Sequence, residues 1–475
     1  MGSSNVHIPR RLTIAVLASA MLVAAIGACS PTDLVNDAPL PPDVPDPGST
    51  KTPAGALAAY YGTLSLFNSA FGGRGNAGNT SAVAISGLIS DELQSGVVGS
   101  PVGAAGDQLS VDSRSLPEFT SVQIESQGGT GAQLYEATYA GLQSVRGQAS
   151  EARGLLMNYA PESQRPLVGH LFAIQGEAEV MLADIFCSGI PLSTIELDGD
   201  YTLQPGSTTK DVYQHAIVLF DSALTLAADS ERFVNLASVG KGRALLAIGD
   251  YAGAATAVAG VPDGFSYLAN YPPAGTSGAV TTQNFAVIIT GTGPWELSTS
   301  DNEGVTGLDF RSSGDPRTTA TELGNNQYGV AIFHPDKYAL TGDSPIVVAD
   351  WVEARLIEAE AALEAGDLTT WLAKLNHLRE TAISPALPDT TDPGTADARL
   401  DLTFRERAFW LYLTAHRQGD LRRLVRQYGR AQNTVFPTGG YRGARGSYGG
   451  DVTVPITARE RVANPLFTGC IGRGA

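Results

Sequence analysis

Apolar residues recur at helical spacing in most regular stretches of this 475-residue chain. Between residues 166 and 186 they follow one another at alternating intervals of four and three positions, which places them on one face of a helix. The members of this stripe are Leu167, Leu171, Ile174, Ala178, Met181 and Ile185. Comparable patterns predict further helices at 53–71, 82–95, 132–159, 209–228, 233–249, 251–259, 367–382 and 402–428.

The stretch 352–364 carries a second apolar stripe, and its acidic residues lie off that stripe. We therefore predict that these acids form a solvated face. They are Glu353, Glu358, Glu360 and Glu364. Carboxylates one or two positions apart on a helix point in different directions, so adjacent acids elsewhere are also predicted to be solvated rather than catalytic. These are Asp91 with Glu92 and Glu177 with Glu179.

Two regions of the sequence read as copies of one unit, a helix followed by a Gly-Asp turn and a second helix. The turns are Gly249-Asp250 and Gly366-Asp367. Glycine supplies the left-handed residue that ends the first helix, and the alanines around each turn allow the paired helices to approach closely, as in tetratricopeptide repeats. The expected fold is therefore mainly α, with tetratricopeptide-like helix pairs, long irregular loops and a few short strands, one of them at 285–289.

Long polar connections at 96–131, 261–346, 383–400 and 431–475 separate the helices. Loops of this length in a compact protein are usually functional or disordered. The span 261–346 combines aromatic rings with amide and carboxylate groups, a combination that suits sugars or peptides. Its aromatic residues are Tyr267, Tyr271, Trp295, Phe310, Tyr328, Phe333 and Tyr338. The candidate ligand-binding residues are Trp295, Asp301, Asn302 and Tyr328, although a loop tryptophan can equally cap the helical core.

The N-terminus has the three parts of an export signal. Arg10 and Arg11 precede an apolar stretch at 12–25, and small residues then lead to Cys29. This pattern predicts a lipoprotein signal peptide at 1–28 and a lipid anchor on Cys29, because the apolar run is shorter than the ~20 residues of a spanning helix. The alternative is an uncleaved transmembrane anchor.

The segment 29–52 is rich in proline and aspartate, so it cannot form a core and is predicted to be an extended tether. No comparable linker divides residues 53–475, which we expect to form a single ligand-binding domain.

The chain contains three cysteines, Cys29, Cys187 and Cys470. An exported protein with one lipidated cysteine and one disulfide shows this count, so we predict a bridge between Cys187 and Cys470. The alternative is a pair of unrelated buried thiols.

The formal net charge of −17 disfavours binding to nucleic acid. Catalytic signatures are missing as well: the sequence has no HExxH, no GxSxG elbow and no P-loop. The histidines have no second histidine or cysteine at ligand spacing, so a zinc site is not expected. We therefore expect a protein that is not an enzyme, with no catalytic residue, no cofactor and no metal ligand identified; whether calcium is bound stays open.

Several separate blocks resemble the SusD/RagB family of surface lipoproteins. Between residues 165 and 460 they occur in the family's order. They are Asp315-Pro316-Arg317, His334-Pro335-Asp336-Lys337-Tyr338, Ser344-Pro345-Ile346, Arg355-Leu356-Ile357-Glu358-Ala359-Glu360-Ala361, Glu406-Arg407, His416-Arg417, Asp420-Leu421-Arg422-Arg423 and Pro455-Ile456, with an earlier block at 173–192. Cys187 and Cys470 depart from the family's pattern, and the N-terminal third matches only by its helices.

The resemblance implies a role as a nutrient-binding lipoprotein of the outer membrane, lipid-anchored and facing the exterior. Such a protein would bind an oligosaccharide or a peptide and deliver it to a TonB-dependent, SusC-like transporter without chemical turnover. Two alternatives stay open from the residues alone. One is a surface-anchored hydrolase of glycans or peptides, and the other is a tetratricopeptide scaffold that binds no nutrient.

Overall fold

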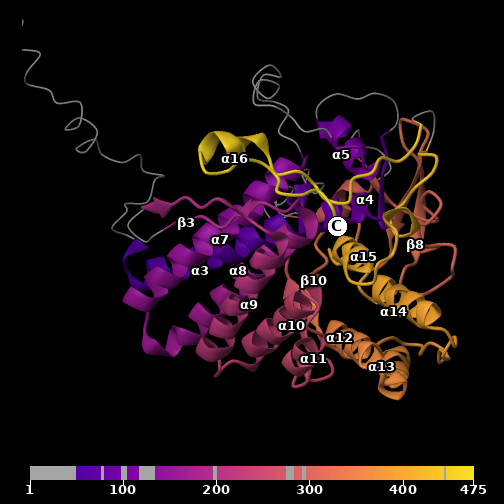
Figure 1. Ribbon diagram of the computed structural model, residues 1–475. Coiled ribbons are helices and arrows are strands. Elements are labelled where there is room, and N and C mark those ends of the chain that lie inside the picture. Colours follow the sequence, from indigo (N-terminus) through magenta and orange to yellow (C-terminus); the bar gives the residue numbers. More distant parts are fainter. Residues whose placement is uncertain are drawn as a thin grey trace, which may run out of the picture. The chain divides into compact units, whose positions relative to one another are not determined.

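The computed structural model describes residues 50–75, 80–97, 104–116, 134–195, 200–273, 283–290, 296–442 and 446–475. Residues Thr52–Ala475 form one compact unit, and every helix and strand named below belongs to it (Figure 1). The predicted signal peptide, Cys29 and nearly all of the predicted tether lie outside the described residues.

Helices dominate this unit. In the first part of the chain they are α3 (Pro53–Gly72), α4 (Ala82–Ile89), α5 (Ala104–Asp112), α7 (Leu134–Tyr159), the short 3-10 helix η3 (Glu162–Gln164), α8 (Arg165–Ile185) and α9 (Thr209–Leu226). Helix α8 is buried on nearly every side because it packs against α7, α9 and α10. This explains why residues beyond the single predicted stripe, polar ones such as Glu177 and Glu179 included, are buried as well.

The later helices form the second part of the same unit. They are α10 (Glu231–Ala247), α11 (Tyr251–Val258), η5 (Phe285–Ile288), α12 (Trp351–Glu364), α13 (Leu368–Thr381), α14 (Ala396–Trp410), α15 (Arg417–Arg426), η6 (Gln432–Thr434) and α16 (Ala458–Ala463). Helix α10 packs on α11 and α12 on α13, while α11 contacts α12, so the two predicted pairs stand side by side (Figure 1).

Both predicted turns have the expected chemistry. Gly249 and Gly366 adopt positive φ angles of 82° and 75°, which end the first helix of each pair. The following aspartates cap the second helices: the Asp250 carboxylate accepts a hydrogen bond from the Gly253 backbone N–H, and Asp367 accepts one from Thr370. The tetratricopeptide-like pairs are therefore confirmed.

The strands among the described residues are short and pair antiparallel in twos. The pairs are β1 (Leu93–Ser95) with β7 (Leu297–Thr299), β2 (Ile190–Pro191) with β5 (Gly206–Ser207), β3 (Thr194–Ile195) with β4 (Tyr201–Thr202), β6 (Ser266–Ala269) with β10 (Ile346–Asp350), and β8 (Ala320–Asn325) with β9 (Ala331–Pro335). A mainly helical fold with a few short strands is thus confirmed.

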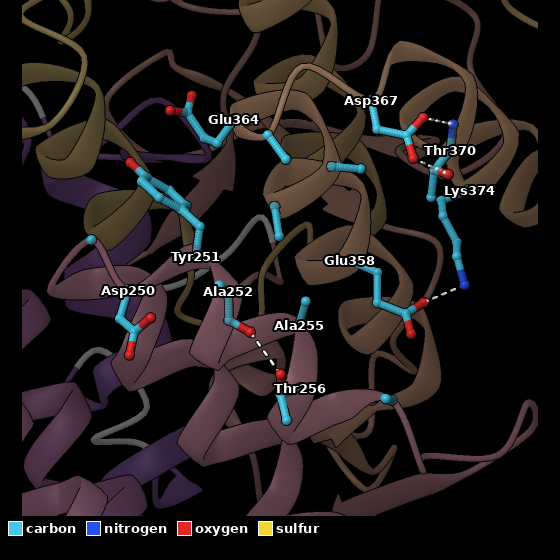
Figure 2. A pocket seen from close by; sticks show the side chains of 15 residues that line it. Asp250, Tyr251, Ala252, Ala255, Thr256, Glu358, Glu364, Asp367, Thr370 and Lys374 are labelled. Carbon is cyan, nitrogen blue, oxygen red and sulfur yellow. Dashed lines mark hydrogen bonds and ion pairs between the residues drawn. The ribbon is translucent and has the colours of Figure 1, made fainter.

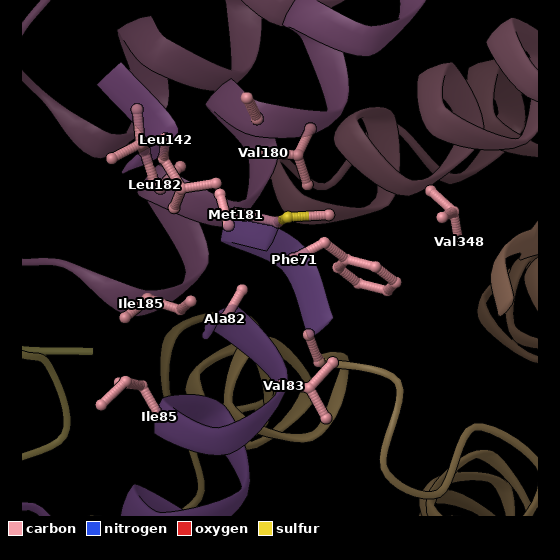
Figure 3. Close-up of a cluster of buried hydrophobic side chains, with 14 of the residues drawn as sticks. Phe71, Ala82, Val83, Ile85, Leu142, Val180, Met181, Leu182, Ile185 and Val348 are labelled. Atoms are coloured by element: carbon pink, nitrogen blue, oxygen red, sulfur yellow. The ribbon is translucent and has the colours of Figure 1, made fainter. Parts of the chain in front are cut away.

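The largest hydrophobic core joins segments that are far apart in the sequence. Figure 3 shows Phe71 and Val83 near Met181 and Val180 of α8, with Val348 of β10 at its edge. Burial of these side chains contributes roughly 25 cal/mol per Å² of apolar surface removed from water. The core therefore fixes the loops that emerge from α4, β7 and β10.

Three element predictions are wrong. The helix predicted at 82–95 ends at Ile89 and continues as strand β1. The helix predicted at 402–428 is two helices, because Leu413 and Ala415 between them adopt positive φ angles of 55° and 67°. The segment predicted as a strand at 285–289 forms the 3-10 helix η5. Apolar periodicity could not reveal these breaks, which depend on tertiary contacts.

Within the ranges that the structure describes, no helix combines the length and the apolar character needed to cross a bilayer.

Candidate functional site

The β8–β9 hairpin is closed by residues 326–330, and we call these residues, together with Asn325 at the end of β8, the hairpin tip. Its fixed point is Asn326, a buried amide. The Asn326 side-chain oxygen accepts hydrogen bonds from the backbone N–H groups of Tyr328 (3.0 Å) and Val330 (3.1 Å). Its Nδ2 donates to the Gly96 carbonyl, 2.6 Å away at the end of β1. One amide therefore shapes the turn and fastens it to the β1–β7 pair.

Tyr328 projects from this fixed turn and is 40% exposed. Asn325 and Gln327, on either side of the buried Asn326, are exposed too. An exposed ring beside two amides can stack on an apolar face of a ligand and hydrogen-bond its polar edge. The hairpin tip is therefore the candidate ligand-binding surface.

Asp301 and Asn302 shape a different loop. The Asp301 Oδ1 accepts hydrogen bonds from the backbone N–H groups of Arg311 (2.8 Å) and Ser312 (3.0 Å). Asn302, at a positive φ of 51°, donates from Nδ2 to the Ser312 hydroxyl at 2.8 Å. The structure thus gives both residues a positioning role in the loop, and their contact with a ligand stays a prediction. Trp295 lies outside the described residues.

Several other loop aromatics belong to the core rather than to an open surface. Phe310 is fully buried and packs against Phe409 and Tyr412, and Tyr338 is buried with its hydroxyl donating to the Leu413 carbonyl. The aromatic span in the sequence therefore mixes core residues with the exposed Tyr328.

A buried pair of carboxylates, Asp112 and Glu303, lies behind this region. Asp112 accepts hydrogen bonds from Tyr441 (2.6 Å) and Arg442 (2.5 Å), and Glu303 accepts one from Tyr448 (2.8 Å). Burial, and then the charge of Asp112, raise the pKa of Glu303 well above its ordinary value. The pair ties α5 and the loop after β7 to the C-terminal segment 441–448.

Sequence reasoning missed Arg442. Its Nη1 donates to the Ser95 carbonyl at 3.3 Å, next to the Gly96 carbonyl that Asn326 holds, and its side chain is about one-third exposed. No spacing in the sequence relates Arg442 to these residues, more than 300 positions earlier. The structure thus places a partly exposed guanidinium beside β1, next to the point where Asn326 anchors the hairpin tip.

The prediction of solvated acids is wrong for Asp91, Glu92, Glu177, Glu179, Glu353 and Glu360, which are buried. Glu364 is exposed as predicted, and Glu358 is partly exposed. Arg243 of α10 joins Glu177 of α8 at 2.7 Å and Glu353 of α12 at 2.6 Å, and both carboxylates are almost completely buried. Burial alone would raise the pKa of Glu353, but the charges of Arg243 and His416 hold it well below its ordinary value.

The remaining buried acids have similar partners. Asp91 forms a two-bonded pair with Arg417, at 2.7 and 2.9 Å. Glu179 binds Arg146 and His215, at 2.8 and 2.6 Å. Glu92 accepts a hydrogen bond from the Leu413 backbone N–H at 2.9 Å. We call the buried ion pairs of Arg146, Arg243, Arg407, Arg417 and Arg423 the ion-pair network, which Glu92 adjoins through its neighbour Asp91.

The blocks that resemble the SusD/RagB family supply much of this network. Asp420 binds Arg407 through two bonds, at 2.8 and 2.9 Å, and also Arg423 at 2.9 Å. Arg423 reaches Glu360 as well. Arg422 donates to the Asp184 carbonyl at the end of α8, at 2.8 Å. These residues stabilise helix packing, and none of them faces an open site.

The structure contains a disulfide between Cys187 and Cys470, whose Cα atoms are 5.8 Å apart. Beside it, two backbone hydrogen bonds hold the tail: the Ile471 N–H donates to the Ser188 carbonyl at 2.7 Å, and the Ser188 N–H donates to the Gly472 carbonyl at 3.0 Å. The C-terminal segment is thus fastened to the end of α8.

Histidine, cysteine, aspartate and glutamate side chains do not gather in threes at metal-binding distance anywhere in the described part of the chain.

Comparison with known proteins shows which proteins this chain resembles in sequence and in fold. Residues 351–457 match the model of the SusD family. A SusD superfamily protein from Bacteroides thetaiotaomicron VPI-5482 superposes with a TM-score of 0.63 at 15% identity, over 89% of this chain and 100% of that one. A SusD superfamily protein and a putative sugar binding protein, both from Bacteroides vulgatus ATCC 8482, superpose with TM-scores of 0.58 and 0.57, each at 15% identity over 89% of this chain and 99% of theirs.

The fold is therefore that of the SusD superfamily. Together with the match at 351–457, it confirms the resemblance to the SusD/RagB-like family that the sequence blocks indicate. Among curated proteins, no significant match to the sequence is found.

Proposed function

We propose that this protein is a lipid-anchored, SusD-like binding protein of the outer membrane that captures an oligosaccharide or a peptide for a TonB-dependent, SusC-like transporter. The observation that carries the proposal is the hairpin tip, where Asn326 holds the turn that exposes Tyr328, with further exposed amides at Asn325 and Gln327. A preorganised tip loses little conformational entropy when a ligand binds.

An oligosaccharide is the first candidate ligand. A sugar ring offers an apolar face to Tyr328 and hydroxyl groups to Asn325 and Gln327. A structural neighbour from Bacteroides vulgatus is described as a putative sugar binding protein, which supports the same choice. A peptide is the second candidate, since the same amides can bind its backbone.

Binding without turnover fits the acids near the tip. Asp112 and Glu303 are buried and engaged by tyrosine hydroxyls and Arg442, so they are not placed to protonate a ligand bound at the surface. A glycosidase needs two carboxylates that both reach the scissile bond.

A ligand screen on the full-length protein tests the proposal. We expect an oligosaccharide or peptide that binds the parent protein and binds Tyr328→Ala about tenfold or more weakly, since a stacked aromatic ring contributes ~1–3 kcal/mol. The matched control is Tyr201→Ala, which removes a tyrosine that is 69% exposed on β4. Equal loss in both variants would contradict the assignment of the site, and release of cleaved product would favour the hydrolase alternative.

Location and partnership need separate experiments. Cys29→Ser should move the protein from the membrane fraction to the soluble fraction, because the acyl chains on this residue would supply the anchor. A transporter of TonB-dependent type should co-purify with the parent protein from native membranes. Its absence from such preparations would count against delivery to a transporter while leaving ligand binding intact.

A further inference from the structure

A groove of about 790 Å³ lies between α11, α12 and α13 (Figure 2). Tyr251, Ala252 and Ala255 line it from α11, and Thr370 and Lys374 line it from α13. The groove thus follows the junction between the two tetratricopeptide-like pairs, on elements other than those that carry the hairpin tip.

Alanines form most of the apolar lining. They are Ala252, Ala255, Ala259, Ala361, Ala362 and Ala365. A methyl side chain does not reach across the space between two helices, so the junction stays open where larger residues would close it. An incoming backbone can therefore approach these helices closely.

The charged side chains that line the groove are mainly acidic. Asp250, Glu358, Glu364 and Asp367 stand against the one ammonium group of Lys374. Lys374 is already bound to Glu358, with Nζ 2.6 Å from the carboxylate oxygen, and Arg355 binds the same oxygen at 2.6 Å. This leaves Asp250, Glu364 and Asp367 as the acids of the lining without a basic partner among these two. The lining therefore carries an excess of negative charge, in a chain whose formal net charge is −17.

Glu364 marks the more acidic end of the groove. Its carboxylate lies on the same side as Tyr251 (Figure 2). Burial, and then the charge of Glu360, raise the pKa of Glu364 above its ordinary value. Glu360 is already paired with Arg423, so a cation brought to this end would pair with the exposed carboxylate of Glu364.

The lining also limits the shape of an occupant. Backbone groups of α11, α12 and α13 are bonded within their own helices, so the groove offers no strand edge to an extended peptide. A helix brings its own backbone hydrogen bonds and can lay an apolar face into such a groove. Tyr251 is the groove's one aromatic lining residue, which makes a sugar a poorer fit.

We propose that the α11–α13 groove docks a cationic amphipathic helix of a partner protein, with small apolar residues against the alanines and lysine or arginine beside the acidic rim. This interaction surface is independent of nutrient binding at the hairpin tip. Attraction between the acidic rim and a basic partner would also speed their association.

Two synthetic helical peptides test the proposal directly. Both carry the same alanine and leucine face, one flanked by lysines and the other by glutamates, and each is titrated against the full-length protein by fluorescence anisotropy. We expect binding of the lysine peptide, at least about tenfold weaker binding of the glutamate peptide, and weakening as the salt concentration rises.

Variants of the groove locate the binding. Ala255→Trp and Ala252→Trp place an indole in the open space and should each weaken the lysine peptide by about tenfold or more. The matched control, Ala386→Trp, adds the same side chain at an exposed loop position. Glu364→Lys should weaken binding as well, whereas Glu151→Lys makes the same charge change on an exposed position of α7.

Each result is decisive once circular dichroism shows that the variants are folded. Selective loss in the groove variants, with Tyr328→Ala unchanged, supports the proposal. Equal binding of both peptides, no binding of the lysine peptide, or unchanged binding by both tryptophan variants would overturn it. If the groove bound small apolar molecules but not the lysine peptide, the proposal would be overturned as well.

Discussion

The ion-pair network and the hairpin tip use polar side chains in opposite ways. In the network, Arg243 is buried and fully engaged by Glu177 and Glu353. At the tip, one buried amide, Asn326, satisfies the backbone while the neighbouring Tyr328 stays exposed. The network therefore holds helices together, and the tip holds a side chain out.

This difference shows which part of the molecule the family resemblance describes. The blocks that resemble the SusD/RagB family supply Glu360, Arg407, Asp420 and Arg423, which all lie in the network. Tyr328 belongs to none of those blocks. The resemblance thus reports the packing of the fold and does not identify a ligand-binding surface.

The disulfide beside the network should give the largest effect. Cys470→Ser is the better variant because Cys470 is only partly buried, whereas Cys187 is fully buried. The bridge spans 283 positions, for which chain entropy gives about 5–6 kcal/mol, while measured losses are typically about 2–5 kcal/mol. Urea unfolding with and without reductant measures the loss. Reductant should destabilise the parent and leave Cys470→Ser unchanged; an equal response of both would contradict the bridge.

Removing one partner from the network comes next. Glu353→Ala leaves the buried Arg243 with only Glu177, and breaking a buried pair in this way costs roughly 3–5 kcal/mol. The matched control is Asp397→Ala, which removes an exposed partner of Arg430 and should cost roughly 0–1 kcal/mol. Equal losses in urea unfolding would show that the network is no stronger than a surface pair.

Glu92, which adjoins the network, should make the stability of the protein depend on pH. Burial raises the pKa of Glu92 to about 8, from an ordinary value of 4.5. The folded state therefore keeps this proton while the unfolded chain releases it, so stability is lost as the pH rises from 4.5 to 8. Glu92→Gln cannot ionise and should lose less stability over this interval. Urea unfolding at pH 5 and pH 8 measures this loss. An equal change in the free energy of unfolding for the parent and Glu92→Gln would contradict the raised pKa of Glu92.

The tip should respond more weakly than the network. Asn326→Ala removes three hydrogen bonds and leaves the N–H groups of Tyr328 and Val330 without their acceptor. We expect a loss of about 1–3 kcal/mol in the free energy of unfolding, together with weaker ligand binding. The control Asn325→Ala changes an exposed neighbour. A loss of affinity in Asn325→Ala alone would show that the tip does not depend on Asn326.

Much of the fold could be predicted from the sequence because helical periodicity and the Gly-Asp turns are local signals. Gly249 and Gly366 end helices as expected. The prediction that the acids are solvated failed because their partners are remote in the sequence. Glu353 pairs with an arginine 110 positions away, and no neighbouring residue marks it as buried. In the sequence, a helix face that is exposed to solvent and a helix face whose acids pair with buried arginines show the same pattern of polar positions.

The candidate site was less accessible to sequence reasoning. Tyr328 could be selected as a loop aromatic, but Phe310 and Tyr338 satisfied the same criterion and are buried. Asn326 is one of the amides of the span 261–346, but no local pattern marks it as the anchor of the turn, since its partner Gly96 is 230 positions earlier. The placement of a loop side chain depends on such remote contacts.

The smallest expected effect separates stacking from hydrogen bonding at the tip. Tyr328→Phe keeps the ring and removes only the exposed hydroxyl, so the free energy of unfolding should change by no more than about 0.5 kcal/mol. If the ring face carries recognition, Tyr328→Phe should retain affinity within about threefold, while Tyr328→Ala loses about tenfold or more. Calorimetric titration of both variants with one ligand measures the difference. Equal losses would assign recognition to the hydroxyl, and the tip would then resemble the network in acting through polar contacts.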